Sequence, residues 1–338
     1  MLIQENYSLR TSNTFGIHAL ARYYAEVSSH VEIRELLADS RFKENDRLFL
    51  GGGSNILLSQ DYTGLVVKIN LMGIEVLKED DHACFIGVGA GENWHDLVTY
   101  CINHGYSGIE NLSLIPGNVG AAPMQNIGAY GVEFKDVFHE LIALNIYTGE
   151  EVVFSKSDCC FGYRTSVFKE GERGNYVICK VVLRLRKNPV FNVSYGAIQK
   201  ELDAMAVTQL SIEAIGKAVC NIRRSKLPDP IDIGNAGSFF KNPIIDGAQF
   251  EELKKQFPQI VGFKGNGMEV KVAAGWLIEQ CNWKGKRVGD AGVHADHALV
   301  LVNYGSATGE EIYRLSEKIN ESVREKFGIN LEREVSVI

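Results

Sequence analysis

The first part of the chain alternates between helical and strand-like patterns of apolar residues. Residues 32–42 have the spacing of a short helix, and the apolar runs at 47–51 and Val66–Ile69 predict strands. Helix and strand patterns that alternate in this way are typical of a small α/β unit. We place the end of this unit near residue 71, where the pattern changes.

Strand patterns dominate the next part of the chain. Apolar residues between Trp94 and Ile102 fall at helical spacing, and Gly105 follows as a C-cap. A second helix is predicted at 211–222, with the Ser211 side chain as its N-cap. Strands are predicted at Cys84–Val88, 140–147, 151–154 and 176–185.

The segment Lys226–Pro230 cannot continue a helix because it contains two prolines, so it predicts a domain boundary. Beyond it, Trp276, Leu277 and Cys281 suit a helix that ends near Gly285. A longer helix is predicted to stop at Gly328, with one apolar face formed by Ile312, Leu315, Ile319 and Val323.

Two strands are predicted in this last part, at His297–Asn303 and Ile329–Val337. Successive side chains of a strand point to opposite faces. In the final strand, Leu331, Val335 and Val337 therefore share one face, and Glu332 and Glu334 share the other.

Composition narrows the class of protein. A chain of 338 residues is too long for one ordinary core, so two or three domains are expected. The net charge of −7 argues against a general nucleic-acid binder, although it allows a local cationic pocket for an anion. Met1–Thr14 lacks a signal-peptide core, and no apolar run reaches the roughly 18 residues of a membrane span. We expect a cytoplasmic protein.

The cysteines and histidines do not predict a disulfide or a metal site. Of the seven cysteines, only Cys159 and Cys160 are close in sequence, and adjacent cysteines rarely bond to each other. We expect reduced thiols. His294 and His297 are three residues apart but lack partner ligands, so no metal is expected.

Two glycine-rich stretches suit the binding of a ligand. Gly51–Asn55 follows a strand, and consecutive glycines let backbone N–H groups surround an anion, with side-chain donors from Ser54 and Asn55. The dinucleotide fingerprint fails because Ile56 stands where its third glycine would be, and no Gly-Lys-Ser/Thr follows. The alternative is a structural hairpin turn.

The second stretch, Ile115–Gly131, contains four glycines and two prolines, so no long regular element fits it. Such a rigid irregular segment suits contact with a ring system. A long surface loop is the alternative, but the apolar content of the stretch argues against full exposure.

Three further segments carry reactive or charged side chains. Gly234–Pro243 combines glycines with Ser238, two aromatic residues and Lys241, and its alternative is a turn, a short strand and a turn. Arg164 presents a permanently charged fork that suits a carboxylate, but a lone loop arginine is usually solvated. On the last strand, Glu334 competes with Glu332 as a functional glutamate.

Taken together, these five segments resemble one family, the UDP-N-acetylenolpyruvoylglucosamine reductases, from about Asn13 to about Val335. The resemblance implies an α+β fold, in which a two-domain FAD-binding unit of the vanillyl-alcohol-oxidase (PCMH) type precedes a C-terminal α/β substrate-binding domain. The implied domains are 1–71, with the strand 335–338 returning to it, then 72–226 and 227–334.

The resemblance also implies the chemistry. NADPH would reduce FAD, and FAD would then reduce UDP-N-acetylglucosamine enolpyruvate to UDP-N-acetylmuramate for peptidoglycan. Neither His nor Cys occurs between Gly51 and Ser59, so non-covalent FAD is expected. Arg164 would bind the enolate's carboxylate and Ser238 would donate the proton. Glu334, whose protonated form burial favours, would polarise the carboxylate end.

The remaining site residues are also carried over from the family. Ala121 and Ala122 replace hydroxyl residues of some members, so backbone groups would serve there. Tyr195, on an insertion at roughly 186–210, places the chain in the family type with a tyrosine-bearing mobile loop. The implied cofactor contacts are Gly51, Gly52, Gly53, Ser54, Asn55, Ile115, Pro116, Gly117, Asn118, Gly120, Ala121, Gly128 and Arg223. The implied substrate contacts are Tyr130, Tyr195, Lys226, Asn242 and His297.

Two rival functions stay open. Another flavoprotein of the same superfamily would share the glycine-rich loops but would not need a serine acid. A nucleotide-sugar-binding protein without redox chemistry would need no flavin.

A cluster of basic residues suits the binding of a diphosphate, although such clusters are usually solvated surface. Its members are Arg223, Arg224, Lys226 and Lys241. The partners expected are small molecules, and the chain is expected to be a monomer.

Overall fold

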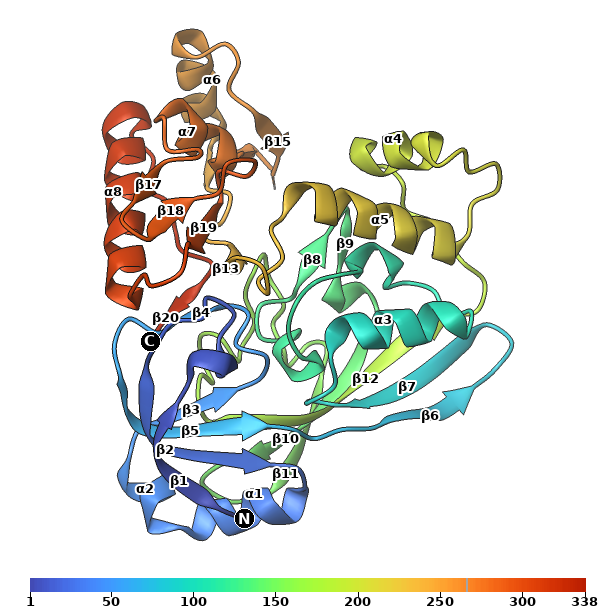
Figure 1. The fold of residues 1–338 in the computed structure, drawn as a ribbon. Coiled ribbons are helices and arrows are strands. Elements are labelled where there is room, and N and C mark those ends of the chain that lie inside the picture. Colours follow the sequence, from blue (N-terminus) through green and yellow to red (C-terminus); the bar gives the residue numbers. More distant parts are fainter. Residues whose placement is uncertain (266) are drawn as a thin grey trace. The chain divides into compact units, whose positions relative to one another are not determined.

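The computed structural model describes residues 1–265 and 267–338, and the chain divides into two compact units (Figure 1). The first unit contains Met1–Tyr7, Leu20–Gly52 and Tyr62–Ser225. The second contains Ser8–Ala19, Gly53–Asp61 and Lys226–Ile338. Two short segments of the N-terminal part thus belong to the second unit. The finer division into three domains stays a prediction.

A small, mostly parallel sheet opens the first unit. Its strand order is β1-β2-β5-β3, with β5 parallel to both β2 and β3. Parallel strands need crossover connections. The connection from β2 to β3, which lie on either side of β5, contains two helices, and this confirms the predicted α/β unit. The bounds are β1 Ile3–Ser8, β2 Leu20–Val27, α1 His30–Ala38, α2 Ser40–Glu44, β3 Arg47–Leu50 and β5 Tyr62–Ile69.

The single helix predicted at 32–42 is wrong, because Asp39 divides it into α1 and α2. Asp39 has extended backbone (φ −70°, ψ 139°), and its carboxylate accepts the N–H of Arg41 at 2.8 Å. An aspartate in this position caps the helix that follows it. The side chain therefore ends one helix and starts the next.

A five-stranded antiparallel sheet forms the larger part of the first unit. Its order is β11-β10-β12-β7-β6, and the four predicted strands in this region are confirmed. Figure 1 shows α3 (Trp94–Asn103) along this sheet, with Trp94, Leu97 and Cys101 in the shared core. Gly105 follows α3 with φ +76°. The strand bounds are β6 Ile74–Glu79, β7 Ala83–Gly89, β10 Phe138–Asn145, β11 Glu151–Ser155 and β12 Tyr176–Arg186.

Irregular chain lies between α3 and β10, as predicted for the second glycine-rich stretch. It contains only short pieces: three 3-10 turns, η2 Glu110–Leu112, η3 Val119–Ala121 and η4 Phe134–Asp136, and a two-stranded hairpin, β8 Gly128–Ala129 and β9 Val132–Glu133. Two helices, α4 (Gly196–Ala204) and α5 (Ile212–Lys226), close the first unit's sequence. The Ser211 hydroxyl accepts the N–H of Ala214 at 3.0 Å, which confirms its capping role.

The second unit is built on a sheet of order β13-β19-β18-β17. The long helix α8 (Gly309–Phe327) contacts β18 and β19 through the predicted apolar face and ends at Gly328, where φ is +66° (Figure 1). A left-handed residue at this position is best supplied by glycine. The strands are β13 Gly234–Ser238, β17 Arg287–Val288, β18 Ala291–Val293 and β19 Val300–Asn303.

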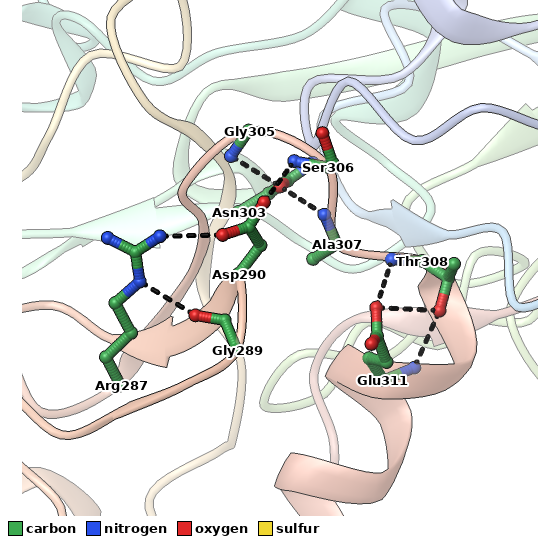
Figure 2. Close-up of polar contacts among 9 residues, drawn as sticks. All are labelled: Arg287, Gly289, Asp290, Asn303, Gly305, Ser306, Ala307, Thr308 and Glu311. Carbon is green, nitrogen blue, oxygen red and sulfur yellow. Dashed lines mark hydrogen bonds and ion pairs between the residues drawn. The ribbon is translucent and has the colours of Figure 1, made fainter.

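The loop from β19 into α8 is fixed by side-chain caps (Figure 2). The Asn303 amide oxygen accepts the N–H groups of Gly305 and Ala307, at 2.9 and 3.0 Å. Asp290 accepts the N–H of Ser306 at 3.0 Å and pairs with Arg287. Thr308 and Glu311 then form a reciprocal capping box at the start of α8.

Smaller elements complete the second unit. A three-stranded sheet, β14-β16-β15, packs against α6, and the final strand pairs in parallel with a short strand after the first glycine-rich turn. The bounds are η1 Arg10–Ser12, β4 Ile56–Leu57, β14 Ile244–Asp246, α6 Gly247–Gln256, β15 Gly262–Lys264, β16 Glu269–Val272, α7 Ala274–Gln280 and β20 Ser336–Val337.

Three predicted element ends in the second unit are wrong. The helix expected to reach Gly285 stops at Gln280, because the chain turns through Asn282 with φ +59°. The strand expected from His297 begins at Val300, whose N–H closes a turn on the His297 carbonyl. The final strand is regular only at β20. Of the three apolar residues predicted to share its face, Leu331 and Val335 are buried and Val337 is partly buried.

Candidate active site

The predicted site residues fall into one group in each unit. The first unit carries Gly51, Gly52, Ile115, Pro116, Gly117, Asn118, Gly120, Ala121, Gly128, Tyr130, Arg164, Tyr195 and Arg223. The second carries Gly53, Ser54, Asn55, Lys226, Ser238, Asn242, His297 and Glu334.

The two glycine-rich stretches approach each other in the first unit. A Cβ added at Gly52 would lie 2.8 Å from the Asn118 amide oxygen and 3.1 Å from the Gly117 Cα. Only glycine allows so close an approach. On β5, the Lys68 ammonium group donates to the Gly51 carbonyl, and burial lowers the pKa of Lys68. Lys68 was not predicted, since a single strand lysine carries no motif.

Two side chains bond to the backbone of Leu114, the residue just before the second glycine-rich stretch. Leu114 has left-handed backbone (φ +59°), its N–H donates to Nδ1 of His95 at 3.0 Å, and its carbonyl accepts Nε of Arg223 at 3.1 Å. Burial lowers the pKa of His95, which favours the neutral ring that can accept this bond. Arg223, predicted to contact the cofactor, thus supports the stretch that begins at Ile115. His95 was not predicted.

Arg164 lies against the same stretch. It occupies a tight turn in which Gly162 and Thr165 form a β-bridge, and its own φ is +56°. The guanidinium donates to the Gly128 carbonyl at 2.7 Å. A left-handed arginine carries backbone strain, which proteins keep mainly where the position matters for function.

Tyr130 and Tyr195, both predicted substrate contacts, lie together in the first unit. Their rings meet edge to face, with centroids 5.3 Å apart and an interplanar angle of 90°. Tyr195 is 48% exposed, whereas burial raises the pKa of Tyr130. The insertion that carries Tyr195 is therefore in contact with the second glycine-rich stretch.

Asn111, a buried asparagine that was not predicted as a site residue, links the Tyr195 insertion to the second glycine-rich stretch by hydrogen bonds. Its side-chain nitrogen donates to the carbonyl of Tyr130 at 3.0 Å and to that of Asn192 at 2.9 Å. Asn192 in turn donates to the Gly131 carbonyl at 2.9 Å. Asn111 stands in no recognisable motif, and only its burial in the folded protein distinguishes it from a surface asparagine.

In the second unit, Ser238 and Glu334 lie on neighbouring backbone segments. Ser238 ends β13, and the N–H of Glu334 donates to the carbonyl of the next residue, Phe239, at 2.9 Å. Lys241 N–H donates to the Glu332 carbonyl, also at 2.9 Å, and Phe240 bridges Arg333. These antiparallel contacts bring two backbone segments from positions almost 100 residues apart side by side, one just after Ser238 and one containing Glu334.

Asn55 supports the same place from the first glycine-rich turn. Its amide nitrogen donates to the Glu334 carbonyl at 3.2 Å, and its own carbonyl accepts the N–H of Ser336 at 3.1 Å. The Asn55 side-chain amide, which was expected to donate to the cofactor, therefore donates to the Glu334 backbone.

The other predicted residues of the second unit have local roles as well. Lys241 forms an ion pair with Glu332. Asn242 accepts the N–H of Ala274 at 3.0 Å and so caps α7, while His297 lies half-buried in the turn before β19. Lys226 is exposed as the last residue of α5.

Comparison with known proteins decides the family. Residues 229–338 match the family model for the C-terminal domain of UDP-N-acetylenolpyruvoylglucosamine reductase, and residues 21–155 match an FAD binding domain. A reductase of that name from Amoebophilus asiaticus is 53% identical over the full length of both chains. The chain belongs to the UDP-N-acetylenolpyruvoylglucosamine reductase family. A second reductase, from Flavobacterium johnsoniae, is 48% identical, again over the full length of both.

A solved member of the family has the same fold. The crystal structure of the Thermus caldophilus enzyme covers 99% of each chain, with a TM-score of 0.68 and 25% identity. The predicted α+β fold, an FAD-binding unit followed by a C-terminal domain, is confirmed, and so are the predicted FAD cofactor and the class of FAD-dependent oxidoreductases. Among the helices of the described residues, none is long and apolar enough to cross a bilayer.

Proposed function

We propose that this chain reduces UDP-N-acetylglucosamine enolpyruvate to UDP-N-acetylmuramate with NADPH, in the synthesis of peptidoglycan precursors. Full-length similarity to reductases of this name supports the reaction. The observation that carries the chemical assignment is the ladder that places Glu334 beside the Ser238 segment. We further propose a cytoplasmic monomer whose partners are small molecules.

The residues present fit FAD. Glycines 51, 52 and 117 leave a backbone surface without side chains, which exposed N–H groups can line around a pyrophosphate. The strained, well-supported stretch from Leu114 to Gly131 offers rigid contact for a ring system. When bound, FAD would supply the hydride-transfer chemistry that links NADPH to the enolpyruvyl group.

The chain's own residues then stabilise charge and move one proton. Arg164 binds the substrate carboxylate, where negative charge increases as the enolate forms. Ser238 donates a proton from its hydroxyl to the carbon next to that carboxylate. Glu334 orients and polarises the carboxylate end. Lys241, already paired with Glu332, contributes a smaller positive field at Ser238 than an isolated lysine would.

The nucleotide part of the substrate is held away from the reacting carbons. Tyr195 and Lys226 bind the diphosphate, and Tyr130, Asn242 and His297 complete the contacts. An exposed tyrosine at the start of α4 is free to change its rotamer and cover a bound ligand, and its edge-to-face contact with Tyr130 gives it a resting position.

A coupled assay tests the function. NADPH consumption by the yellow, FAD-loaded protein should depend on the enolpyruvyl nucleotide sugar, with UDP-N-acetylglucosamine as the unreactive control. Formation of UDP-N-acetylmuramate in equal amount would exclude the rival oxidase. A colourless protein that binds the nucleotide sugar but cannot be reconstituted with FAD would support the binding protein instead.

A further inference from the structure

One face of α8 carries a polar stripe that runs along the segment containing Glu334. Tyr313, Ser316, Glu317 and Asn320 are spaced by three, one and three residues, so they share one side of the helix. This stripe is separate from the apolar face of Ile312, Leu315, Ile319 and Val323, which is buried in the core of the second unit. Polar side chains beside a buried face need partners.

Arg333 is the main partner of the stripe. Its Nε donates to the Ser316 hydroxyl at 3.0 Å, its Nη2 forms an ion pair with Glu317, and its guanidinium lies 4.6 Å from the centre of the Tyr313 ring. Ser316 is fully buried and donates onward to the Tyr313 carbonyl at 2.6 Å, so its hydroxyl is fixed. Three kinds of contact thus hold one guanidinium.

The same segment is attached to α8 at a second point and, on its other side, to the chain that follows β13. Leu331 N–H donates to the Asn320 side chain at 2.7 Å, one helical turn from Ser316. The backbone of Arg333 bridges Phe240, and the N–H of Glu334 bonds Phe239. Residues 331–334 therefore lie between α8, which is capped at both ends, and the chain that follows Ser238.

We propose that Arg333 is a positioning residue: by anchoring residues 331–334 to α8, it sets the place of the Glu334 carboxylate relative to the Ser238 hydroxyl. The inference rests on the proposed roles of Ser238 and Glu334. Glu334 follows Arg333 directly, so a change in the anchor moves the glutamate's Cα. A leucine or methionine at 333 could fill the space but could neither donate to Ser316 nor form an ion pair with Glu317.

The test separates the two half-reactions by stopped-flow absorption of the flavin. Displacing a catalytic group by about 1 Å can cost roughly 100-fold, so Arg333→Gln should slow reoxidation of the reduced flavin by the enolpyruvyl substrate by about 10-fold to 100-fold. Reduction of the flavin by NADPH should change by less than about twofold, because Glu334 takes no part in it. Arg333→Lys, which keeps the charge, should recover part of the loss.

Two further variants make the result specific. Arg314→Gln removes an exposed arginine of the same helix that pairs only with Glu310 among the ion pairs of the described residues, and it should leave both rates unchanged. Ser316→Ala removes the acceptor of Arg333 and should slow reoxidation too. In the Arg333→Gln background it should add little, since both changes remove one interaction.

A purely structural role for Arg333 would lower the fraction of folded, flavin-loaded protein, and hence the amplitudes, without a selective change in one rate constant. Equal slowing of both half-reactions, or an unchanged reoxidation rate, would overturn the proposal. Failure of the proposed function looks different: the wild-type flavin would then not be reoxidised by the enolpyruvyl substrate at all.

Discussion

Several residues of the candidate site have left-handed backbone, which is unfavourable for residues other than glycine. Leu114, Tyr130 and Arg164 all have φ between +51° and +59°, a region that branched or bulky residues rarely occupy. Hydrogen bonds hold each of these conformations. Leu114 bonds to His95 and Arg223, the Tyr130 carbonyl accepts from Asn111, and the Arg164 guanidinium donates to the Gly128 carbonyl. Tyr130 and Arg164 were predicted as site residues from the sequence, and Leu114 was not. The strained conformations were not, because they depend on partners far away in the chain.

At the residue scale, Lys68 gives a prediction about FAD. In a trans peptide the carbonyl of Gly51 and the N–H of Gly52 point in opposite directions. Lys68 holds that carbonyl, so it also turns the Gly52 N–H away from itself. Lys68→Met keeps the stem but loses the donor. The dissociation constant of FAD should rise at least roughly 10-fold, since a charged hydrogen bond contributes about 1.5–3 kcal/mol.

Fluorescence titration of the apoprotein with FAD measures this constant. Lys78→Met, at an exposed position on β6, is the matched control and should bind FAD as the wild type does. Unchanged affinity in Lys68→Met would show that the glycine turn keeps its orientation without the lysine.

At the scale of elements, the interiors were predictable and the ends were not. Periodicity located α3, α5 and α8 and four strands of the five-stranded sheet, because each presents apolar residues to a core. It missed the edge strand β6, whose side chains are mostly exposed. The break at Asp39 and the early end of α7 come from single turns, which leave almost no periodic signal. The segment around Glu334 was predicted as a strand, but its hydrogen bonds go to different partners on either side.

The same limit applies to the site. Sequence motifs predicted Arg164, Ser238 and Glu334 as catalytic residues, because each of them lies in a segment that resembles the family. Lys68, His95, Asn111 and Arg333 lie in no such segment, and each acts on a residue at a distance in the chain that no local pattern encodes. Supporting residues of this kind become visible only when the chain is folded.

The segment from Leu114 to Gly131 gives a prediction about pH. The Leu114 N–H needs an unprotonated Nδ1 on His95, and burial lowers the pKa of His95 from its ordinary 6.5. As pH falls below 6.5, the unfolded chain gains a proton at His95 that the folded chain does not. The His95 contribution to folding stability therefore decreases as pH falls through this range, and it is constant above it.

Denaturant unfolding at pH 7.5 and pH 5.5 measures the effect. His95→Gln can still accept from Leu114 but does not titrate, so the loss of stability between these two pH values should be smaller than in the wild type. His104→Gln, an exposed histidine that follows α3, is the control and should keep the wild-type pH dependence. An equal loss in wild type and His95→Gln would contradict the role of His95.

For the whole molecule, the two units divide the proposed work. The first carries the FAD-binding match, the facing glycine turns and Arg164, and the second carries Ser238, Glu334 and the α8 anchor. Reduction of the flavin by NADPH needs no protein acid, whereas reduction of the enolpyruvyl group needs a proton for carbon. Changes near Ser238 should therefore affect one half-reaction and spare the other.

The rate of each half-reaction in Ser238→Ala tests this account most directly. A serine can donate here because the enolate carbon it protonates is itself strongly basic. The variant should bind FAD and be reduced by NADPH at a near-normal rate, and its reoxidation by the enolpyruvyl substrate should slow by more than roughly 100-fold. Ser238→Cys should recover part of the loss. If Ser238→Ala slowed both half-reactions equally, or neither, Ser238 would not be the proton donor and the central claim would be wrong.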